Sequence, residues 1–221
     1  METRPASERT TIRRLPKRAA YDRAMIDAIL DEALHCHLGF AVDGQPYVIP
    51  TIHARVADRV YVHGSAASRM LRTLAGAVPA CLTVTLVDGL VLARSAFHHS
   101  MNYRSVVVLG TAQAVVEPAE KVAALHAIVE HVVPGRWDDV RPPNERELKA
   151  TSVLCLPLTE ASAKVRTGGP LDDEEDLGLP CWAGVLPFSA VPGAPVPDEH
   201  VAPGTPAPAC VTGYRRPRYT A

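Results

Sequence analysis

The sequence predicts a mainly β protein with peripheral helices, an α+β chain in which six or seven antiparallel strands curve into a small barrel. Short apolar runs recur through the first 165 residues, as expected for strands. Asp43-Gly44 and Asp88-Gly89 are typical of tight turns between antiparallel strands. Because so many strands in a core of about 150 residues would leave exposed edges, closure into a barrel is favoured.

The composition is that of one globular domain with tails: 221 residues, 47% hydrophobic and 21% charged. A largely disordered chain is therefore excluded. The formal net charge of -1 gives no bulk attraction to nucleic acid, and no apolar run approaches the roughly 20 residues of a membrane span. The basic N-terminus lacks an apolar signal segment. We expect a soluble cytoplasmic protein that binds neither nucleic acid nor membranes.

Changes in composition divide the chain into three parts. Residues 1–20 are basic and predict a flexible arm, residues 21–187 carry the strand and helix patterns, and residues 188–221 form a Pro-rich tail. Near the end of the central part, the acidic run 172–176 is interpreted as a solvated loop rather than a cation site.

The first half of the central part alternates between helix and strand signals. A helix begins after Asp22, a plausible cap, because apolar side chains recur there at helical spacing. Strands follow at 38–42, 47–54 and 59–63, the first two joined by Asp43-Gly44. A second helix covers 68–74 and ends at Gly76.

The second half opens with two predicted strands, 80–87 and 90–97, around Asp88-Gly89. Another strand covers 105–116. A helix starts at Pro118 and stops at Pro134-Gly135, and a short one covers 145–151. The last strand is predicted over 153–158, extending through 161–165. Cys36, Cys81 and Cys155 lie in apolar runs and are interpreted as small core residues.

The segment 62–69 joins a strand to a helix and carries the residues of an anion site. Ser65 or Ser68 can cap the helix, so that its first amide groups and Arg69 face one place. Free N–H donors, the positive end of the helix dipole and a guanidinium together suit phosphate. A capped helix with a surface arginine is the alternative interpretation.

Histidine pairs raise the question of a metal, and we predict none. His35 and His37 share one face of a strand, whereas the adjacent His98 and His99 cannot. A metal site needs three or four convergent ligands, and five scattered cysteines without a Cys-x-x-Cys pair add none. The sequence also lacks the motifs of serine hydrolases, P-loop proteins and Rossmann folds.

Four stretches, in order, resemble the FMN-binding split-barrel superfamily that includes pyridoxamine 5'-phosphate oxidase, and more closely its nitroimidazole-resistance or flavin-nucleotide-binding branch. Residues 44–51 resemble the strand along the flavin ring, and residues 61–69 the segment that holds the FMN phosphate. Residues 103–110 resemble an arginine-led strand that reaches the ring. Residues 180–185 are similar to a Trp-Gly-Gly segment that contacts the flavin of the neighbouring subunit.

The resemblance implies an antiparallel split β-barrel of the FMN-binding type and a set of cofactor-binding residues. Ser68 and Arg69 would hold the phosphate beside Ser65, and His63 and Thr51 would bond around the phosphate or the ribityl chain. The other expected contacts to the flavin ring come from Ile49, Pro50, Ser105 and Trp182. His98 or His99 could serve as the catalytic proton donor.

The function that follows from the resemblance is that of a homodimeric FMN-dependent oxidoreductase with its flavin at the subunit interface. It would reduce a small electron-poor molecule, a nitro compound or a quinone, with electrons from NAD(P)H. Met70 replaces a second basic residue, and the Pro-rich region after Trp182 has no Arg and His set that matches the one with which the oxidase holds pyridoxal phosphate, so oxidation of pyridoxamine phosphate itself is not expected. The alternatives are a non-catalytic flavin carrier or sensor, a deazaflavin in place of FMN, and a haem protein with His35, His98 or His99 as iron ligand.

Overall fold

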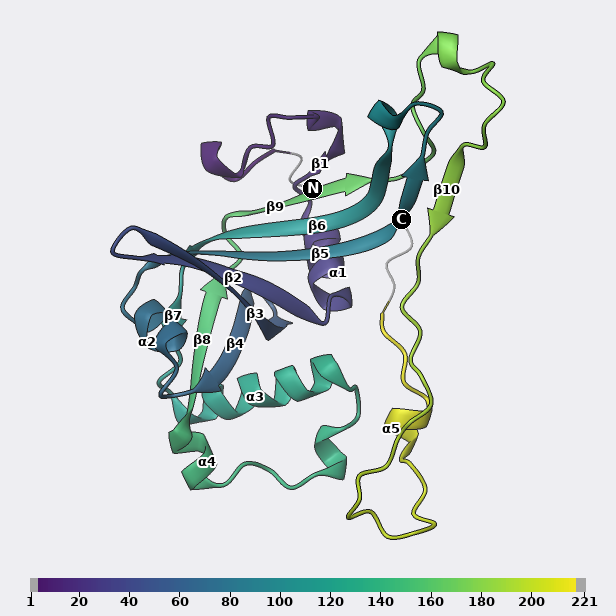
Figure 1. The fold of residues 1–221 in the computed structure, drawn as a ribbon. Helices are drawn as coiled ribbons and strands as arrows, with labels where there is room; N and C mark the ends of the chain where they lie inside the picture. Colours follow the sequence, from purple (N-terminus) through teal and green to yellow (C-terminus); the bar gives the residue numbers. More distant parts are fainter. Residues whose placement is uncertain (1–3, 218–221) are drawn as a thin grey trace.

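The computed structural model describes residues 4–217 and confirms a mainly β fold with peripheral helices (Figure 1). Seven long strands match the predicted number, and three short ones (β1, β7 and β10) bring the sheet in the described chain to ten. All the pairings are antiparallel. The strands are β1 (Ala19–Ala20), β2 (His35–Val42), β3 (Gln45–Val56), β4 (Arg59–Ser65), β5 (Pro79–Leu92), β6 (Ser100–Thr111), β7 (Gln113–Ala114), β8 (Thr151–Pro157), β9 (Ala161–Arg166) and β10 (Gly184–Pro187).

The sheet runs in the order β1-β9-β6-β5-β2-β3-β4-β8-β7 and curls so that its two halves enclose one core. Leu38 of β2, Leu82 of β5, Val106 of β6 and Leu154 of β8 are at most 2% exposed and belong to one apolar cluster. Burial of such side chains from both halves of the sheet is the main stabilising term of a barrel of this size.

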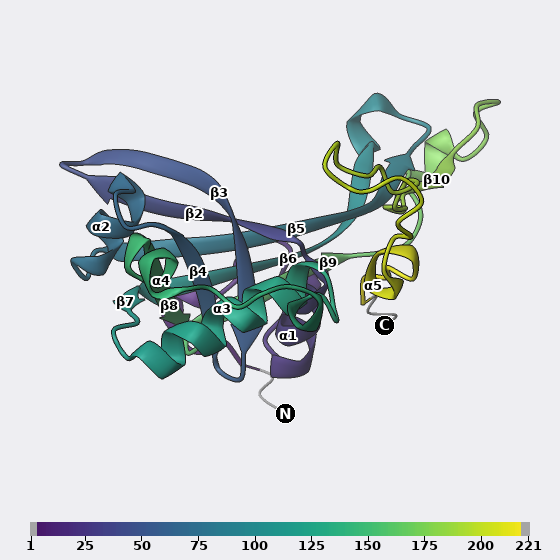
Figure 2. The ribbon, with the colours of Figure 1, turned by 90° about the horizontal axis from the view of Figure 1, so that it is seen from below.

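Helices cover the ends and the outside of the barrel (Figure 2). In α1 the cap is as predicted, because the Asp22 carboxylate accepts a hydrogen bond of 2.9 Å from the amide of Met25. The helix α3 lies against β3 and β4 and closes a second, smaller apolar cluster that includes Tyr61 and Ile128. The helices are α1 (Arg23–Glu32), α2 (Arg69–Ala75), α3 (Pro118–Val132), α4 (Glu145–Ala150) and α5 (Ala209–Thr212).

One of the two predicted hairpin turns is wrong. Asp43-Gly44 joins β2 to β3 as expected, with a positive φ at both residues. Asp88-Gly89 instead lies inside β5, which runs unbroken from 79 to 92 with a register shift between Val87 and Gly89. A Cβ atom at Gly89 would come within 2.7 Å of the Leu186 carbonyl oxygen, so this glycine permits the close approach of β10.

The far ends of β5 and β6, together with β10, form an arm that projects from the barrel (Figure 1). The acidic run 172–176 folds back on this arm, and it is only partly the solvated loop that we predicted. The Asp172 side chain is 2% exposed and accepts hydrogen bonds from the amide and the guanidinium of Arg94 at 2.8 and 2.7 Å. The loop therefore fastens the arm through a buried ion pair.

Both terminal segments touch the barrel where they are described. Ala19 and Ala20 pair with β9, and Thr10 is buried. From β10 the tail descends along one side of the molecule to α5 and returns to α1 (Figure 1). Within residues 4–217, no helix combines the length and the apolar character needed to cross a membrane.

Candidate functional site

The connection between β4 and α2 contains three of the residues expected to hold phosphate. Ser65 Oγ accepts a hydrogen bond of 3.2 Å from the amide of Ala67, and the Ser68 amide donates to the Ser65 carbonyl at 2.9 Å. Ser68 is the N-cap of α2, yet its side chain makes no capping hydrogen bond. The tight turn thus presents the Ser68 hydroxyl and Arg69 side by side in the chain.

Arg69 is exposed, and its guanidinium lies 4.8 Å from the centre of the Tyr47 ring. A cation over an aromatic face is stabilised by roughly 0.5–1 kcal/mol at an exposed site, which is enough to favour one orientation. Arg69 has no ion pair with a carboxylate in the part of the chain that the structure describes. Its charge is therefore available to an anion beside the β2–β3 hairpin.

The expected ring-bordering residues on β3 have different surroundings. Ile49 packs against the main core, so only part of its side chain faces solvent. Pro50 is exposed and pairs with His37 of β2, whereas Thr51 is half-buried and pairs with Cys36. Pro50 has no amide hydrogen, so at this position β3 offers one hydrogen-bond donor fewer.

Two polar residues of the stretch 103–110, which resembles the strand that reaches the flavin ring, already have partners. The Ser105 hydroxyl donates to the Lys164 carbonyl at 3.2 Å. Arg104, from the segment resembling an arginine-led strand, pairs with Asp88 at 2.7 Å and with Glu32. Its guanidinium thus ties α1 to the arm.

His63 lies in a different setting from Arg69. Its half-buried ring lines a pocket under α3, and its buried Nδ1 has no hydrogen-bond partner among the described residues. Burial lowers the pKa of His63, so the ring is neutral near pH 7. The other pocket residues are Leu125, Ile128, Val129, Trp137, Val140, Arg141, Pro143, Glu147 and Thr151. The pocket thus combines a neutral imidazole with apolar side chains from α3 and the Arg141–Glu147 ion pair.

The structure does not bring His98, His99 and Trp182 to the β4–α2 connection. All three lie on the arm, where His98 Nε2 is 3.0 Å from Asp173 and His99 Nδ1 is 2.9 Å from the Ser95 carbonyl. Trp182 is 69% exposed and lies against Gly184 of β10. No group of three or more metal-ligating side chains converges among residues 4–217.

The sequence analysis did not predict two features of the site. One is the contact of Tyr47 with Arg69, and the other is the group of α3 side chains that line the pocket of His63. The tyrosine lies in a stretch that was singled out for its likeness to a flavin-binding strand, so an aromatic residue before Pro50 was the available signal. The wall comes from α3, where Leu125, Ile128 and Val129 recur on one helical face. That periodicity predicts a buried face but not the histidine beneath it.

The chain belongs to the pyridoxamine 5'-phosphate oxidase family, whose sequence model matches residues 22–165. This confirms the predicted superfamily and the split-barrel fold of the FMN-binding type. A comparison with curated proteins found no match.

Solved structures give a finer comparison. The flavocytochrome Anf3 from Azotobacter vinelandii is 43% identical, with a TM-score of 0.90 over 96% of this chain and 99% of that one. A protein described as binding FAD and haem, from Mycobacterium smegmatis, is 36% identical, with a TM-score of 0.87 over 90% and 98% of the two chains. A proposed 5-nitroimidazole antibiotic resistance protein from Bacteroides thetaiotaomicron shares the fold, at 24% identity and a TM-score of 0.55 over 66% and 86%.

Proposed function

We propose that this protein binds a flavin whose phosphate is held at the β4–α2 connection. The observation that carries the proposal is Arg69, which follows Ser68 in the chain and whose exposed guanidinium lies 4.8 Å from the centre of the Tyr47 ring. Arginine can meet phosphate with two parallel hydrogen bonds, and the preceding turn adds hydroxyl donors. Two relatives named for flavin or FAD binding support the proposal, since both align over at least 90% of this chain.

The identity of the flavin is the first refinement. The family resemblance predicts FMN, with a deazaflavin as an alternative, whereas the name of the Mycobacterium smegmatis relative favours FAD. Both FMN and FAD carry the same ribityl phosphate, so Arg69 and Ser68 serve either. The remaining proposed contacts come from Ile49, Pro50, Thr51, Ser65 and Ser105, and from Trp182 on the arm of the neighbouring subunit.

A flavin supplies hydride and single-electron transfer, and the protein tunes and orients it. The proposed activity is reduction of a nitro compound or a quinone with electrons from NAD(P)H, and the rival within the same fold is a non-catalytic carrier or sensor. The flavin would lie in a homodimer interface. On β3, Val48 and Ile52 are 67% and 39% exposed on either side of Pro50, and a second subunit would remove these apolar side chains from water.

An absorbance spectrum of the purified protein tests the proposal, with mass spectrometry of what heat releases. A released flavin in about equal amount to the chain supports it, and the mass distinguishes FMN from FAD. A protein that is colourless and does not bind either flavin when it is added rules the proposal out. Anaerobic turnover with NAD(P)H and a nitroarene or a quinone then separates the oxidoreductase from the carrier.

A second candidate function is that of a flavocytochrome, with haem beside the flavin. The observation that favours it is His63, whose neutral ring lines a pocket with apolar side chains from α3 and whose buried Nδ1 has no hydrogen-bond partner among the described residues. A neutral imidazole nitrogen is a common axial ligand of haem iron, and the walls from α3 and Trp137 suit a flat apolar macrocycle. The pocket residues therefore fit haem, and both relatives aligned above are named for haem or cytochrome.

The histidines predicted from the sequence as haem ligands lie elsewhere. His98 Nε2 bonds Asp173 and His99 Nδ1 bonds the Ser95 carbonyl, so only the second ring nitrogen of each can ligate iron. His35 is exposed on β2, with its ring 5.5 Å from that of His37. A Soret band in the same absorbance spectrum would establish haem, and its absence from protein reconstituted with haemin would eliminate this candidate.

A further inference from the structure

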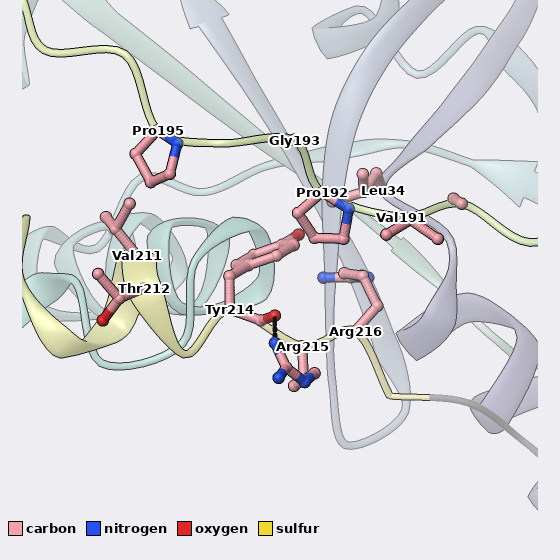
Figure 3. A pocket seen from close by; sticks show the side chains of 11 residues that line it. Leu34, Val191, Pro192, Gly193, Pro195, Val211, Thr212, Tyr214, Arg215 and Arg216 are labelled. Carbon is pink, nitrogen blue, oxygen red and sulfur yellow. Dashed lines mark hydrogen bonds between the residues drawn. The ribbon is translucent and has the colours of Figure 1, made fainter.

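A cavity of about 620 Å³ lies between two stretches of the C-terminal tail and the residue that links α1 to β2 (Figure 3). None of the residues placed in the flavin or haem site lines it. Its volume falls within the range of roughly 300–1,000 Å³ that is usual for small-ligand sites.

The walls of the tail cavity are apolar. Leu34 faces it from the barrel side, and Val191, Pro192, Pro195 and Val211 face it from the tail. Leu34 and Val191 are 43% and 79% exposed, so their side chains stand in water in the unliganded chain. A ligand with an apolar body would remove this surface from water, which is favourable in proportion to the area covered.

The base of the tail cavity is held in place by Arg216. Its guanidinium donates to the carbonyls of Asp31 at 2.7 Å and of Glu32 at 2.9 Å, and also to the His131 carbonyl. These bonds fasten the tail to the ends of α1 and α3. The cavity therefore exists before a ligand arrives, which reduces the entropic cost of binding.

The charge at the tail cavity is positive. Two arginines line the tail cavity. The N–H donors of Arg216 are occupied, and Arg215 lies next to Tyr214 (Figure 3). Arg215 donates only to the neighbouring Tyr214 carbonyl, at 2.8 Å, among the bonds of the described residues. Among the described residues that line the cavity there is no Asp or Glu. The nearby carbonyls of Asp31 and Glu32 at the end of α1 accept hydrogen bonds from Arg216.

We propose that the tail cavity binds a small organic anion, an aromatic or aliphatic carboxylate whose body lies on the Val and Pro walls and whose carboxylate meets Arg215. The Tyr214 ring, half-buried between the two tail stretches, offers a flat surface to an aromatic body. This site is independent of the flavin proposal, because it shares no residue with it.

Titration calorimetry of the full-length protein with 1-naphthoate tests the proposal, with 1-naphthamide as the neutral isostere. We expect saturable binding of the naphthoate and at least tenfold weaker binding of the amide. Arg215→Gln should weaken the naphthoate at least tenfold, because a charge-assisted bond is lost. Val191→Asp should do the same by repulsion, and since Val191 is exposed this change leaves the fold intact.

Arg146→Gln is the matched control, an exposed arginine on α4 that does not line the tail cavity, and its naphthoate affinity should equal that of the wild type. Absence of saturable binding to the wild-type protein would overturn the proposal. So would naphthoate affinities within twofold of the wild type in both Arg215→Gln and Val191→Asp, because the probe would then occupy another site. Equal binding of the amide would also overturn it.

Discussion

The imidazole rings of His53 and His131 lie 4.8 Å apart, centre to centre, and both donate to the C-terminal end of α1. His53 Nε2 donates to the Leu30 carbonyl at 3.0 Å, and His131 Nε2 donates to the Ala33 carbonyl at 2.7 Å. Arg216 covers the carbonyls between them. Three side chains from β3, α3 and the tail thus satisfy the acceptors that a helix end leaves open.

This arrangement predicts a loss of stability in mild acid. Burial, helped by the neighbouring His131, lowers the pKa of His53 from 6.5 to about 4. In the unfolded chain His53 is protonated below about pH 6.5, whereas in the folded chain it is protonated only below about pH 4. The free energy of unfolding therefore falls as the pH drops through this window. Between about pH 7.5 and 5.0 the loss from His53 is about 2 kcal/mol, measurable by urea denaturation.

Burial also lowers the pKa of His131, which adds a loss in the same direction. His53→Gln keeps an N–H donor for Leu30 and cannot be protonated, so its stability should depend less on pH than that of the wild type. His200→Gln, at an exposed position in the tail, is the control and should leave the pH dependence unchanged. A His53→Gln curve parallel to the wild type would contradict this account.

Arg216→Ala should destabilise the protein by about 1–3 kcal/mol, because it leaves the Asp31 and Glu32 carbonyls without their donor. The measurement is the free energy of unfolding in urea at neutral pH. Arg215→Ala is the control in the adjacent position, where, within residues 4–217, the exposed guanidinium bonds only to the Tyr214 carbonyl. We expect a change below about 0.5 kcal/mol there. Equal losses in the two variants would show that the clamp on α1 contributes nothing specific.

Arg69→Ala should weaken flavin binding by about 1.5–3 kcal/mol, roughly 10- to 150-fold in Kd, since a charge-assisted contact to phosphate is lost. Fluorescence titration of the apoprotein with FMN and FAD measures the effect. Arg72→Ala, an exposed arginine one turn further along α2, should retain the wild-type affinity. An unchanged Kd in Arg69→Ala would place the phosphate elsewhere.

The sequence predicts the elements whose signals are local. The Asp22 cap, the start of α3 at Pro118 and the Asp43-Gly44 turn depend on a few neighbouring residues, and the structure has them. Asp88-Gly89 fails for the opposite reason. Gly89 is required because β10, nearly 100 residues later in the chain, packs closely against its backbone. No local sequence pattern reveals this long-range contact.

The residues of the candidate site also fall into those that local sequence predicts and those that depend on long-range contacts. Ser65, Ser68 and Arg69 are contiguous, so a strand-to-helix pattern is sufficient to single them out. The surroundings of His63 come from α3, more than 60 residues further along the chain, and the partners of His98 and His99 come from the arm. Which ring nitrogens of these histidines are bonded therefore depends on tertiary contacts, which the sequence alone does not reveal.

His63→Ala tests the two roles that this histidine can have. If it ligates haem, the variant loses the Soret band after reconstitution with haemin but keeps its flavin absorbance, because Arg69 and Ser68 still hold the phosphate. If it instead bonds the ribityl chain, flavin affinity falls and the haem spectrum is unaffected. His98→Ala and His99→Ala are matched controls, and both spectra should be those of the wild type, since both side chains bond partners on the arm and neither lines the pocket of His63. Loss of the Soret band in either control, but not in His63→Ala, would move the iron ligand to the arm.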